Sequence, residues 1–494
     1  MKTLGTIELR KDRGISLQSE LAMQLKKMVQ SGELRAGERI PSSRELAATL
    51  HISRNTVIGA YDVLMSEGYL ESEQRSGVYV GRAAQAFQLR PTTRGGRSNA
   101  ANAYNAQPNT QFRAPLPFRP AQPDVRLFPI KIWNRHRARV LKRGANILHY
   151  QSVFSSGLDS LRHNIAEYLR DSRGVCCDWR EIAITSGSQQ ALFLLAHLLI
   201  KPGDRVCMED PGYLGARLAW KQAGAQILSA PIDDEGICLP LSDAQPVSLI
   251  YVTPSRQFPL GTCMSLGRRL MLLQTAIRLQ TWIVEDDYDS EFRYKNPPLP
   301  SLQNLDENRR VIYVGTFSKI LFPALRIGYA VLPPELVDRF ASMKHIAEDH
   351  GPLIDQAALS AFMDSGAFHT HLRRCRRHYA ERQQSFLDAV ARHSLPLRFP
   401  ITDGGMNIAG LLPAEVNDFT CSDELRFEGL DIPPLSKYAI FHVRPGLLFG
   451  FTAFDPRTIR RGVEKLARVL DKTRWPVSGK AAGAKTSTRN RAEA

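Results

Sequence analysis

The sequence has no apolar run long enough to cross a bilayer and no arrangement of cysteines typical of disulfide-rich or metal-binding proteins. The most apolar stretch, ALFLLAHLLI, is shorter than the roughly 20 residues of a transmembrane helix, and the N-terminal MKTLGTIELRKDRG lacks the hydrophobic segment of a signal peptide. The seven cysteines are scattered, at positions 176, 177, 207, 238, 263, 375 and 421. These absences predict a cytoplasmic protein with reduced thiols, no metal site and no membrane partner.

Acidic residues are outnumbered by basic ones. Lys and Arg number 65 against 49 Asp and Glu, which gives a formal net charge of +16 and an isoelectric point near 9.6. A positive charge of this size attracts polyanions such as nucleic acids. Many basic proteins nevertheless bind no nucleic acid, so the charge alone does not identify a partner.

The length of the chain and one change in composition indicate two domains. The chain has 494 residues, which is more than one hydrophobic core usually supports. Residues 84–125 are rich in Ala, Asn, Gln and Pro without apolar periodicity and are predicted to form a flexible linker. Residues 473–494 are predicted to be a disordered basic tail. Domains are therefore expected at 1–83 and 126–472.

Residues 1–83 carry the pattern of a winged helix-turn-helix. In SLQSELAMQLKKMVQSGEL, apolar residues recur at helical spacing. Two shorter helices, SRELAATL and RNTVIGAYDVLMSEG, follow the possible N-caps Ser42 and Ser53. The next segment, YLESEQRSGVYVG, predicts two strands joined by a polar turn, which would form the wing.

The stretch SGELRAGERIPSSRELAATLHISRNTVIGAYDVLMSEGYLESEQRSGVYV closely resembles the winged helix-turn-helix of the GntR family of bacterial transcription regulators. The resemblance implies a double-stranded DNA operator as partner, with the second helix of the motif in the major groove. The residues expected to contact DNA are Arg44, Arg54, Asn55, Thr56, Arg75 and Gly77. Alternatively, the two arginines of the helices only pair with surface carboxylates.

The second domain alternates strand-like and helical segments. The segments EIAITSGSQQALFLLAHLLI, DRVCMEDPGY, VSLIYVTPS, TWIVEDDYDS and RVIYVGTFSK each begin with a β-rich run and end in a polar or Gly-containing turn. This alternation predicts an α/β domain with a largely parallel sheet. Ligand sites in such domains lie at the carboxyl ends of the strands, where the polar residues of these segments stand.

Three of these strand ends together match the requirements of pyridoxal phosphate. This cofactor needs a lysine amine for a Schiff base, donors for its phosphate and a carboxylate for its ring nitrogen. Lys319 in GTFSKILFPALRIGY can supply the amine, the turn at 187–189 can hold phosphate, and Asp286 can face the ring nitrogen. Each signal has another interpretation by itself: a surface lysine, an ordinary helix start, and a metal site or solvated loop in EDDYD.

The segments TSGSQQAL, EDPGY, TPSRQFPLG, EDDYDSEFRY and GTFSKILFPALRIGYAVLP resemble the fold-type I aminotransferases. With the N-terminal domain, the whole chain resembles the MocR subfamily of GntR-type regulators. The resemblance implies a homodimer that binds pyridoxal 5'-phosphate and has Lys319 as the catalytic, Schiff-base lysine. The expected cofactor-binding residues are Lys319, Asp286, Tyr288, Arg326, Thr316, Ser188, Gly187, Gln189 and Tyr213.

The sequence departs from the aminotransferase pattern at two places. Aminotransferases usually carry an Asn before the Pro of the TPSRQFPLG loop, where this chain has Phe258, so Tyr288 or Gln257 would have to replace its contact with the cofactor. They also bind the substrate carboxylate with an Arg in a strand near the C-terminus. Arg444 is the nearest candidate for this effector contact, although the expected position is closer to 446–448.

These features favour a transcription regulator whose aminotransferase-like domain senses pyridoxal phosphate or its adduct with an amine. The intact N-terminal domain supports regulation, and the displaced arginine argues against efficient transamination, which requires a well-positioned substrate. The alternative is an aminotransferase with an appended DNA-binding module. A regulator that has lost the cofactor is disfavoured, because the lysine, aspartate and arginine are retained.

Overall fold

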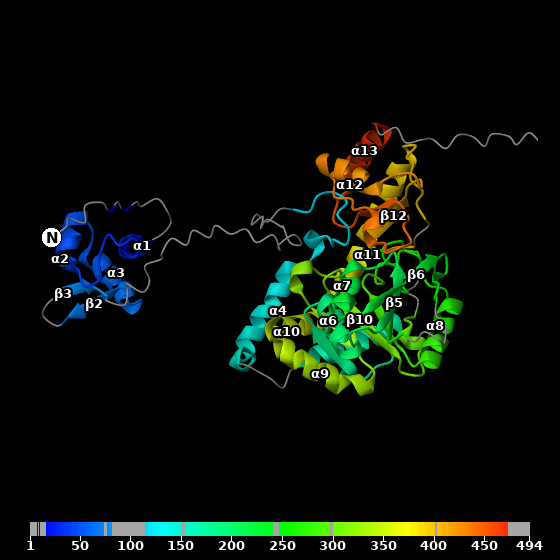
Figure 1. Ribbon diagram of the computed structural model, residues 1–494, viewed down its shortest axis with the longest axis horizontal. Helices are drawn as coiled ribbons and strands as arrows, with labels where there is room; N and C mark the ends of the chain where they lie inside the picture. The colour runs from blue at the N-terminus through cyan, green and yellow to red at the C-terminus, as the bar shows by residue number, and fades with distance from the viewer. Residues whose placement is uncertain are drawn as a thin grey trace, which may run out of the picture. The chain divides into compact units, whose positions relative to one another are not determined.

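The chain forms two compact units, Met1–Gln111 (unit 1) and Phe112–Ala494 (unit 2) (Figure 1). The computed structural model describes residues 7, 9, 16–73, 77–81, 114–149, 155–240, 247–295, 300–400 and 403–472. Arg75, the predicted tail at 473–494 and most of the predicted linker lie outside these described residues. All seven cysteines are free thiols, as expected. Among the described helices, none combines the length and hydropathy needed to span a membrane.

Unit 1 is the predicted winged helix-turn-helix. Its elements are α1 (Leu17–Gln30), β1 (Arg39–Ile40), α2 (Ser43–Leu50), α3 (Arg54–Ser66), β2 (Leu70–Glu73) and β3 (Gly77–Val80). Ser42 and Glu45 form a reciprocal capping box at the start of α2, and the Ser53 side chain accepts a hydrogen bond from the N–H of Asn55 at the start of α3. Strands β2 and β3 pair antiparallel as the wing.

Unit 2 is built on a large mixed sheet that contains all five predicted strands. Its strands are β4 (Ile182–Thr185), β5 (Arg205–Asp210), β6 (Gln226–Asp233), β7 (Gly236–Ile237), β8 (Leu249–Val252), β9 (Trp282–Asp287), β10 (Val311–Thr316) and β11 (Gly328–Val331). Within the described residues it has eight strands, in the order β4-β11-β10-β9-β8-β5-β6-β7. Strands β10, β9, β8, β5 and β6 pair in parallel, whereas β11 runs antiparallel to both neighbours. The carboxyl ends of β4, β5, β8, β9 and β10 therefore lie at one edge.

Helices cover both faces of this sheet. They are α4 (Ile130–Arg143), α5 (Asp159–Arg173), α6 (Ser188–Leu199), α7 (Leu214–Gln222), α8 (Leu266–Leu279), α9 (Pro334–Glu348), α10 (Leu353–Asp364) and α11 (Ala367–Ala391). Alternate residues of β4 belong to different buried clusters, Ile182 and Ile184 to one that contains residues of α5 and Ala183 to one that contains residues of α6. Because both faces are covered, every residue of β4 is buried.

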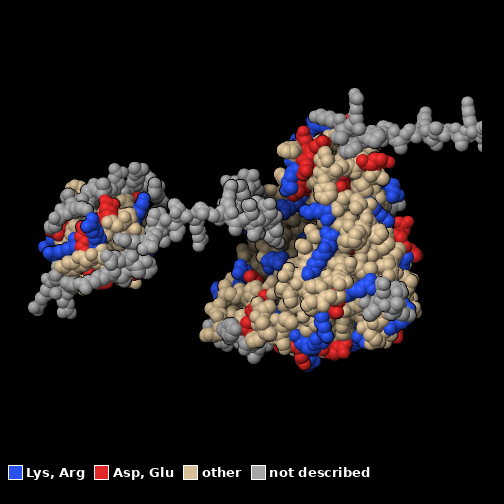
Figure 2. All heavy atoms as spheres, viewed as in Figure 1, with Lys and Arg blue, Asp and Glu red and all other residues tan. Residues whose placement is uncertain are grey.

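A smaller layer follows in the chain. It contains a two-stranded sheet of β12 (Asn407–Leu411) and β13 (Gly446–Gly450), with α12 (Asp418–Phe427) and α13 (Pro456–Lys472). Figure 1 shows α12, α13 and β12 grouped together, apart from the large sheet. On the face of unit 2 seen in Figure 2, basic and acidic side chains are interspersed.

The structure differs from the predicted linker boundary at residue 125. Residues 114–124, which we name the strap, already belong to unit 2 and pack against the rest of it. Phe118 is fully buried, with its ring 5.8 Å from that of Phe386 and 5.9 Å from that of Phe449. The segment is rich in Pro, and no periodic pattern of apolar residues surrounds Phe118, so the sequence did not indicate this aromatic anchor.

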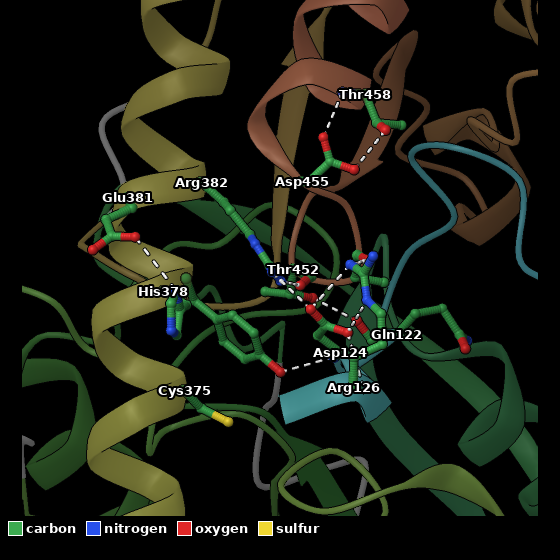
Figure 3. Close-up of polar contacts among 12 residues, drawn as sticks. Gln122, Asp124, Arg126, Cys375, His378, Glu381, Arg382, Thr452, Asp455 and Thr458 are labelled. Atoms are coloured by element: carbon green, nitrogen blue, oxygen red, sulfur yellow. Dashed lines mark hydrogen bonds and ion pairs between the residues drawn. The ribbon is translucent and has the colours of Figure 1, made fainter. Parts of the chain in front are cut away.

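The strap is also held by a buried ionic network (Figure 3). The Asp124 carboxylate accepts hydrogen bonds from Arg126 Nε at 2.8 Å and from Arg382 Nη2 of α11 at 2.7 Å, while its backbone N–H donates to the Tyr379 hydroxyl at 2.9 Å. Thr452 Oγ1 donates to the carbonyl oxygen of Gln122 at 2.6 Å. With Asp124 only 3% exposed, these contacts fix the end of the strap.

Candidate cofactor cavity and DNA-binding surface

A cavity of about 620 Å³ opens at the edge of the sheet where the parallel strands end. This volume is in the range of small-molecule sites, roughly 300–1,000 Å³. Its inner end is lined by Ser188, Tyr213, Tyr251, Thr253, Phe258, Asp286, Tyr288, Thr316 and Lys319. Six of the nine predicted cofactor-binding residues therefore line this cavity: Lys319, Asp286, Ser188, Tyr213, Tyr288 and Thr316.

Asp286, at the end of β9, presents one unused oxygen. Its Oδ2 accepts a hydrogen bond from the Tyr251 hydroxyl at 2.7 Å, whereas its Oδ1 is buried and has no hydrogen-bond partner among the described residues. Burial raises the pKa of this carboxyl to about 7, against the opposing effects of Tyr251 and Lys319. A buried acceptor without a partner is costly, so this oxygen is ready to bind a cationic donor.

The other acidic residues of EDDYD have structural partners. Glu285 accepts the backbone N–H groups of Leu302 and Gln303 at 2.8 and 2.9 Å. Asp287 accepts from Arg173 Nε at 2.9 Å, and Asp289 lies 3.4 Å from Arg256 Nε. These three neighbours of Asp286 are therefore buried groups with structural contacts. Asp286 is the carboxylate of this segment that lines the cavity.

Lys319 follows β10 and is half-buried at the cavity wall. Its Nζ donates a hydrogen bond to the carbonyl oxygen of Ala121, in the strap, at 3.0 Å. Burial lowers the pKa of the ammonium; Asp289 and Asp286 oppose this shift, and Arg326 adds to it. A lowered pKa increases the fraction of uncharged amine, which is the nucleophilic form.

The predicted phosphate-binding residues gather around the start of α6. Gly187 has a φ of +94°, and the Arg326 guanidinium lies beside it, because a Cβ placed on Gly187 would be 3.3 Å from Arg326 Cζ. Helix α6 has no side-chain cap at Gly187, so the N–H groups of its first residues remain available to an anion. The Gln189 side chain instead donates to the carbonyl oxygen of Gly215 at 2.9 Å.

Three aromatic residues of the cavity wall pack against one another. Phe258 packs edge-on against Tyr213 and Tyr288, with ring centroids 5.8 Å apart in both pairs. The Tyr213 hydroxyl donates to Gln189 Oε1 at 3.1 Å. Gln257 does not line the cavity, since its Nε2 donates to the carbonyl oxygen of Pro211 at 2.8 Å. Of the two residues considered as replacements for the missing Asn, only Tyr288 is in place.

The structure does not bring Arg444 to the cavity, which corrects the expected effector contact. Arg444 Nη2 donates to the carbonyl oxygen of Ile232 at 2.7 Å, and the residue lines a separate hollow with Arg398 and Pro413. Leu448 in β13, at the end of the range 446–448 where the aminotransferase pattern expects the carboxylate-binding arginine, is fully buried. The proximity of Arg444 in sequence was misleading, because it precedes the strand and turns outward.

Sequence reasoning missed several residues of the site. Tyr251 orients Asp286, and Thr253 donates a hydrogen bond to the buried Glu209 at 2.6 Å. Both residues reach the site because β8 pairs with β9 and β5, and the sequence of one strand does not reveal its neighbours in the sheet. Arg119 and Ala121 come from the strap, which was assigned to the linker. Burial raises the pKa of Glu209 to about 7, so it too is a protonatable group beneath the cavity.

The predicted DNA-contacting residues lie at the starts of α2 and α3. The side chains of Arg44, Arg54 and Asn55 are exposed, and that of Thr56 is partly exposed. Within the described residues, no carboxylate pairs with either arginine, and Arg54 Nε donates only a long hydrogen bond of 3.4 Å to Ser43. Gly77, with a φ of +125°, begins the second strand of the wing. The pairing of both arginines with surface carboxylates, considered above, is absent from this part of the chain.

Comparison with known proteins identifies both units. Residues 17–80 match the family "Bacterial regulatory proteins, gntR family", and residues 137–466 match "Aminotransferase class I and II". The "Probable rhizopine catabolism regulatory protein MocR" of Rhizobium meliloti is 39% identical, over 93% of this chain and 94% of that protein. The chain belongs to the MocR group of GntR-type transcription regulators.

Two further relatives of this MocR-type regulator are informative. The "HTH-type pyridoxine biosynthesis transcriptional regulator PdxR" of Corynebacterium glutamicum is 30% identical, over 92% of this chain and 96% of that protein. The crystal structure of LysN, an alpha-aminoadipate aminotransferase of Thermus thermophilus complexed with N-(5'-phosphopyridoxyl)-L-leucine, has a TM-score of 0.66 at 30% identity and covers 72% of this chain and 92% of that one. The chain is therefore a DNA-binding regulator with a fold-type I aminotransferase domain, a fold that implies binding of pyridoxal phosphate.

Proposed function

We propose that this regulator binds pyridoxal phosphate in the cavity of unit 2 and that the cofactor, or its adduct with an amine, controls the affinity of the protein for DNA. The observation that carries the proposal is that one cavity holds both a buried carboxylate oxygen of Asp286, which has no hydrogen-bond partner among the described residues, and the half-buried amine of Lys319. The first fits the cationic ring nitrogen of the cofactor, and the second fits its aldehyde.

The remaining residues fit the other parts of the cofactor. The uncapped start of α6 with Ser188, together with Thr316 and the Arg326 guanidinium, would hold the phosphate. Tyr213 and Tyr288 would contact the ring and its hydroxyl. When bound, the cofactor supplies an aldehyde carbon that condenses with a primary amine, and Lys319 provides that amine within the protein.

Regulation is favoured over catalytic turnover by two features of the chain. Strand β13 has the buried Leu448 where a cationic side chain is expected, and Arg444 before the strand does not line the cavity. The usual aminotransferase contact for a substrate carboxylate is therefore missing. Loose positioning of a substrate costs much of the rate of a reaction. The exposed arginines at the starts of α2 and α3 support a DNA-binding output.

The proposed regulator is a homodimer. Val125, Ile130, Leu141 and Leu148, in and around α4, are 46–62% exposed. Clusters of exposed apolar side chains are typical of surfaces that a partner covers. A second copy of the chain on this surface would present two DNA-binding units to repeated half-sites.

The proposal is tested by footprinting the full-length protein on its own upstream DNA with and without pyridoxal phosphate, in parallel with an aminotransferase assay. We expect a protected site whose affinity changes when the cofactor is added, and slow or no transamination. A footprint that is indifferent to the cofactor contradicts the sensing role. Rapid turnover of a common amino acid with a keto acid favours the enzyme instead.

A further inference from the structure

The outer end of the cavity carries two arginines on either side of one carboxylate. Arg119 of the strap and Arg426 of α12 both line the cavity, and Asp431 lies between them. Arg119 Nε is 3.8 Å from Asp431 Oδ2, and Arg426 Nη2 is 4.0 Å from Asp431 Oδ1. Both contacts are ion pairs whose distances exceed those of N–H···O hydrogen bonds, about 2.7–3.2 Å, so neither guanidinium donates a hydrogen bond to this carboxylate.

The backbone that carries Arg119 is held by close contacts, whereas its side chain is largely exposed. The N–H of Gly450 in β13 donates to the carbonyl oxygen of Phe118 at 2.8 Å, and the N–H of Asp431 donates to that of Pro117 at 2.9 Å. A Cβ on Gly450 would collide with the carbonyl oxygen of Arg119, so the strap approaches β13 as closely as a glycine allows. The Arg119 side chain remains 56% exposed and able to turn toward a ligand.

Arg119 is also close to the reactive end of the cavity. Two residues further along the strap, the carbonyl oxygen of Ala121 accepts the hydrogen bond from Lys319. The positive charge of Arg119 contributes to the lowered pKa of Lys319, which places the two groups within electrostatic reach of each other. A molecule with one group at Lys319 can therefore present a second group to Arg119.

The charges of the outer wall identify that second group. Arg119, Arg426 and Lys437 line it with two carboxylates, Asp423 and Asp431, which leaves one positive charge in excess (3 − 2 = 1). Planar guanidinium groups bind carboxylates through paired hydrogen bonds. We infer that the effector is a primary amine that also carries a carboxylate, and that Arg119, assisted by Arg426, binds this carboxylate in place of the arginine that β13 lacks.

This inference rests on the proposed function, since it assigns the effector of the same cavity. It makes Arg119 a specificity-determining residue that does not contribute to holding the cofactor. An amine without a carboxylate, recognised by Asp423, is the competing class of effector. For an amine with a carboxylate, binding should weaken when the carboxylate is removed from the ligand or the guanidinium is removed from Arg119. For an amine recognised by Asp423, neither change should weaken binding.

The experiment titrates the full-length protein, loaded with pyridoxal phosphate, with matched amines and follows the absorption of the bound cofactor. L-alanine and β-alanine are compared with ethylamine, and L-phenylalanine with phenethylamine, because each pair differs by one carboxylate. We expect at least one carboxylated amine to half-saturate at about ten- to a hundred-fold lower concentration than its partner, which is the effect of one charge-assisted contact. Arg119→Gln should abolish this preference, and Arg119→Lys should restore part of it.

The matched control is Arg309→Gln. Arg309 is 51% exposed and paired with Glu181, on unit 2 but outside the cavity lining, so its loss should leave the preference unchanged. Arg119→Gln should still attach the cofactor to Lys319, shown by its absorption before any amine is added, and should still bind DNA. Equal binding of both members of every pair, an unchanged preference in Arg119→Gln, or no response to any carboxylated amine overturns the inference. A wild-type protein that binds no cofactor overturns the proposed function as well, and this result is distinguished by the missing absorption before any amine is added.

Discussion

Lys319 and Ala121 are joined by a hydrogen bond of 3.0 Å, from Nζ of the lysine to the carbonyl oxygen of the alanine. Ala121 belongs to the strap, which is the first described segment of unit 2. A covalently modified Nζ has fewer protons to donate, so attachment of a group to Lys319 weakens or removes this contact. The chemical state of the lysine is therefore linked to the segment of unit 2 that is nearest in sequence to the DNA-binding unit.

Hydrogen exchange in the strap should report this link. We expect the backbone amides of Arg119, Ala121 and Gln122 to exchange about two- to tenfold faster when pyridoxal phosphate is attached to Lys319, because one hydrogen bond contributes about 0.5–1.5 kcal/mol. Mass spectrometry of peptides from wild type and Lys319→Ala, with and without cofactor, provides the measurement. Peptides from α8 serve as an internal control. Cofactor-dependent exchange that persists in Lys319→Ala would show that the lysine is not the link.

Replacing Lys319 with Ala should remove covalent attachment of the cofactor but not the fold. Wild type incubated with pyridoxal phosphate should become yellow and, after borohydride reduction, carry the cofactor on the peptide that contains Lys319. Lys319→Ala should show neither property, while still binding DNA without any response to cofactor. Lys221→Ala, an exposed lysine in α7, is the control and should behave as wild type. Recovery of the reduced cofactor on another lysine would contradict the assignment.

The fold and the inner part of the cavity were predictable from local signals. Ser42 and Ser53 lie at helix starts because their side chains accept hydrogen bonds from backbone N–H groups there. The place of Asp286 near the end of β9 follows from a buried apolar run that ends in acidic residues. Parallel strands place their ends at one edge, so polar residues from distant segments could be expected to meet.

The outer part of the cavity could not be predicted in this way. The strap has neither helical nor strand periodicity. Its place depends on contacts of Phe118 and Asp124 with α11, and these partners, Phe386, Tyr379 and Arg382, are more than 250 residues away in sequence. Arg444 has the right residue type near the right strand, but one strand does not reveal which way the preceding loop turns. Such positions are set by tertiary packing.

Asp124→Asn should destabilise unit 2 by about 3–5 kcal/mol, because it removes one partner of a buried ion pair and leaves Arg382 buried without its counter-charge. The neighbouring arginines hold the pKa of Asp124 below its usual value despite burial. This stabilisation is therefore present above the ordinary carboxyl pKa near 4 and lost as the pH falls. Calorimetry of wild type, Asp124→Asn and the exposed control Asp388→Asn measures the effect. Equal transitions for the two variants would show that the network does not stabilise the unit.

Arg54→Ala should cost about 1–3 kcal/mol in operator binding and relax the base preference, whereas Arg44→Ala should weaken binding to all sequences alike. The difference follows from the proposed contacts, with base edges for Arg54 and backbone phosphate for Arg44. Lys26→Ala is the control, since this amine is already paired with Glu67 at 2.6 Å. Binding of operator and random DNA is measured across a range of salt concentrations. An Arg54→Ala protein with unchanged operator affinity would refute the base contact.

Asp286 should give the cofactor-free protein a pH dependence of stability that the cofactor removes. Burial raises the pKa of the Asp286 carboxyl from 3.8 to about 7. Between these values the unfolded chain releases the proton while the folded protein retains it, so this carboxyl stabilises the fold below pH 4 and loses that effect as the pH rises toward 7.

Asp286→Asn, which cannot ionise, should therefore gain stability relative to cofactor-free wild type between pH 5 and pH 8. In the presence of pyridoxal phosphate the order should reverse. The cationic ring nitrogen would stabilise the ionised carboxylate of wild type, and Asp286→Asn should bind the cofactor about ten- to a hundred-fold more weakly, as expected for loss of one charge-assisted hydrogen bond. Thermal unfolding across this pH range, with and without cofactor, measures both effects. Melting curves that stay parallel with pH, together with unchanged cofactor affinity, would remove Asp286 from the site.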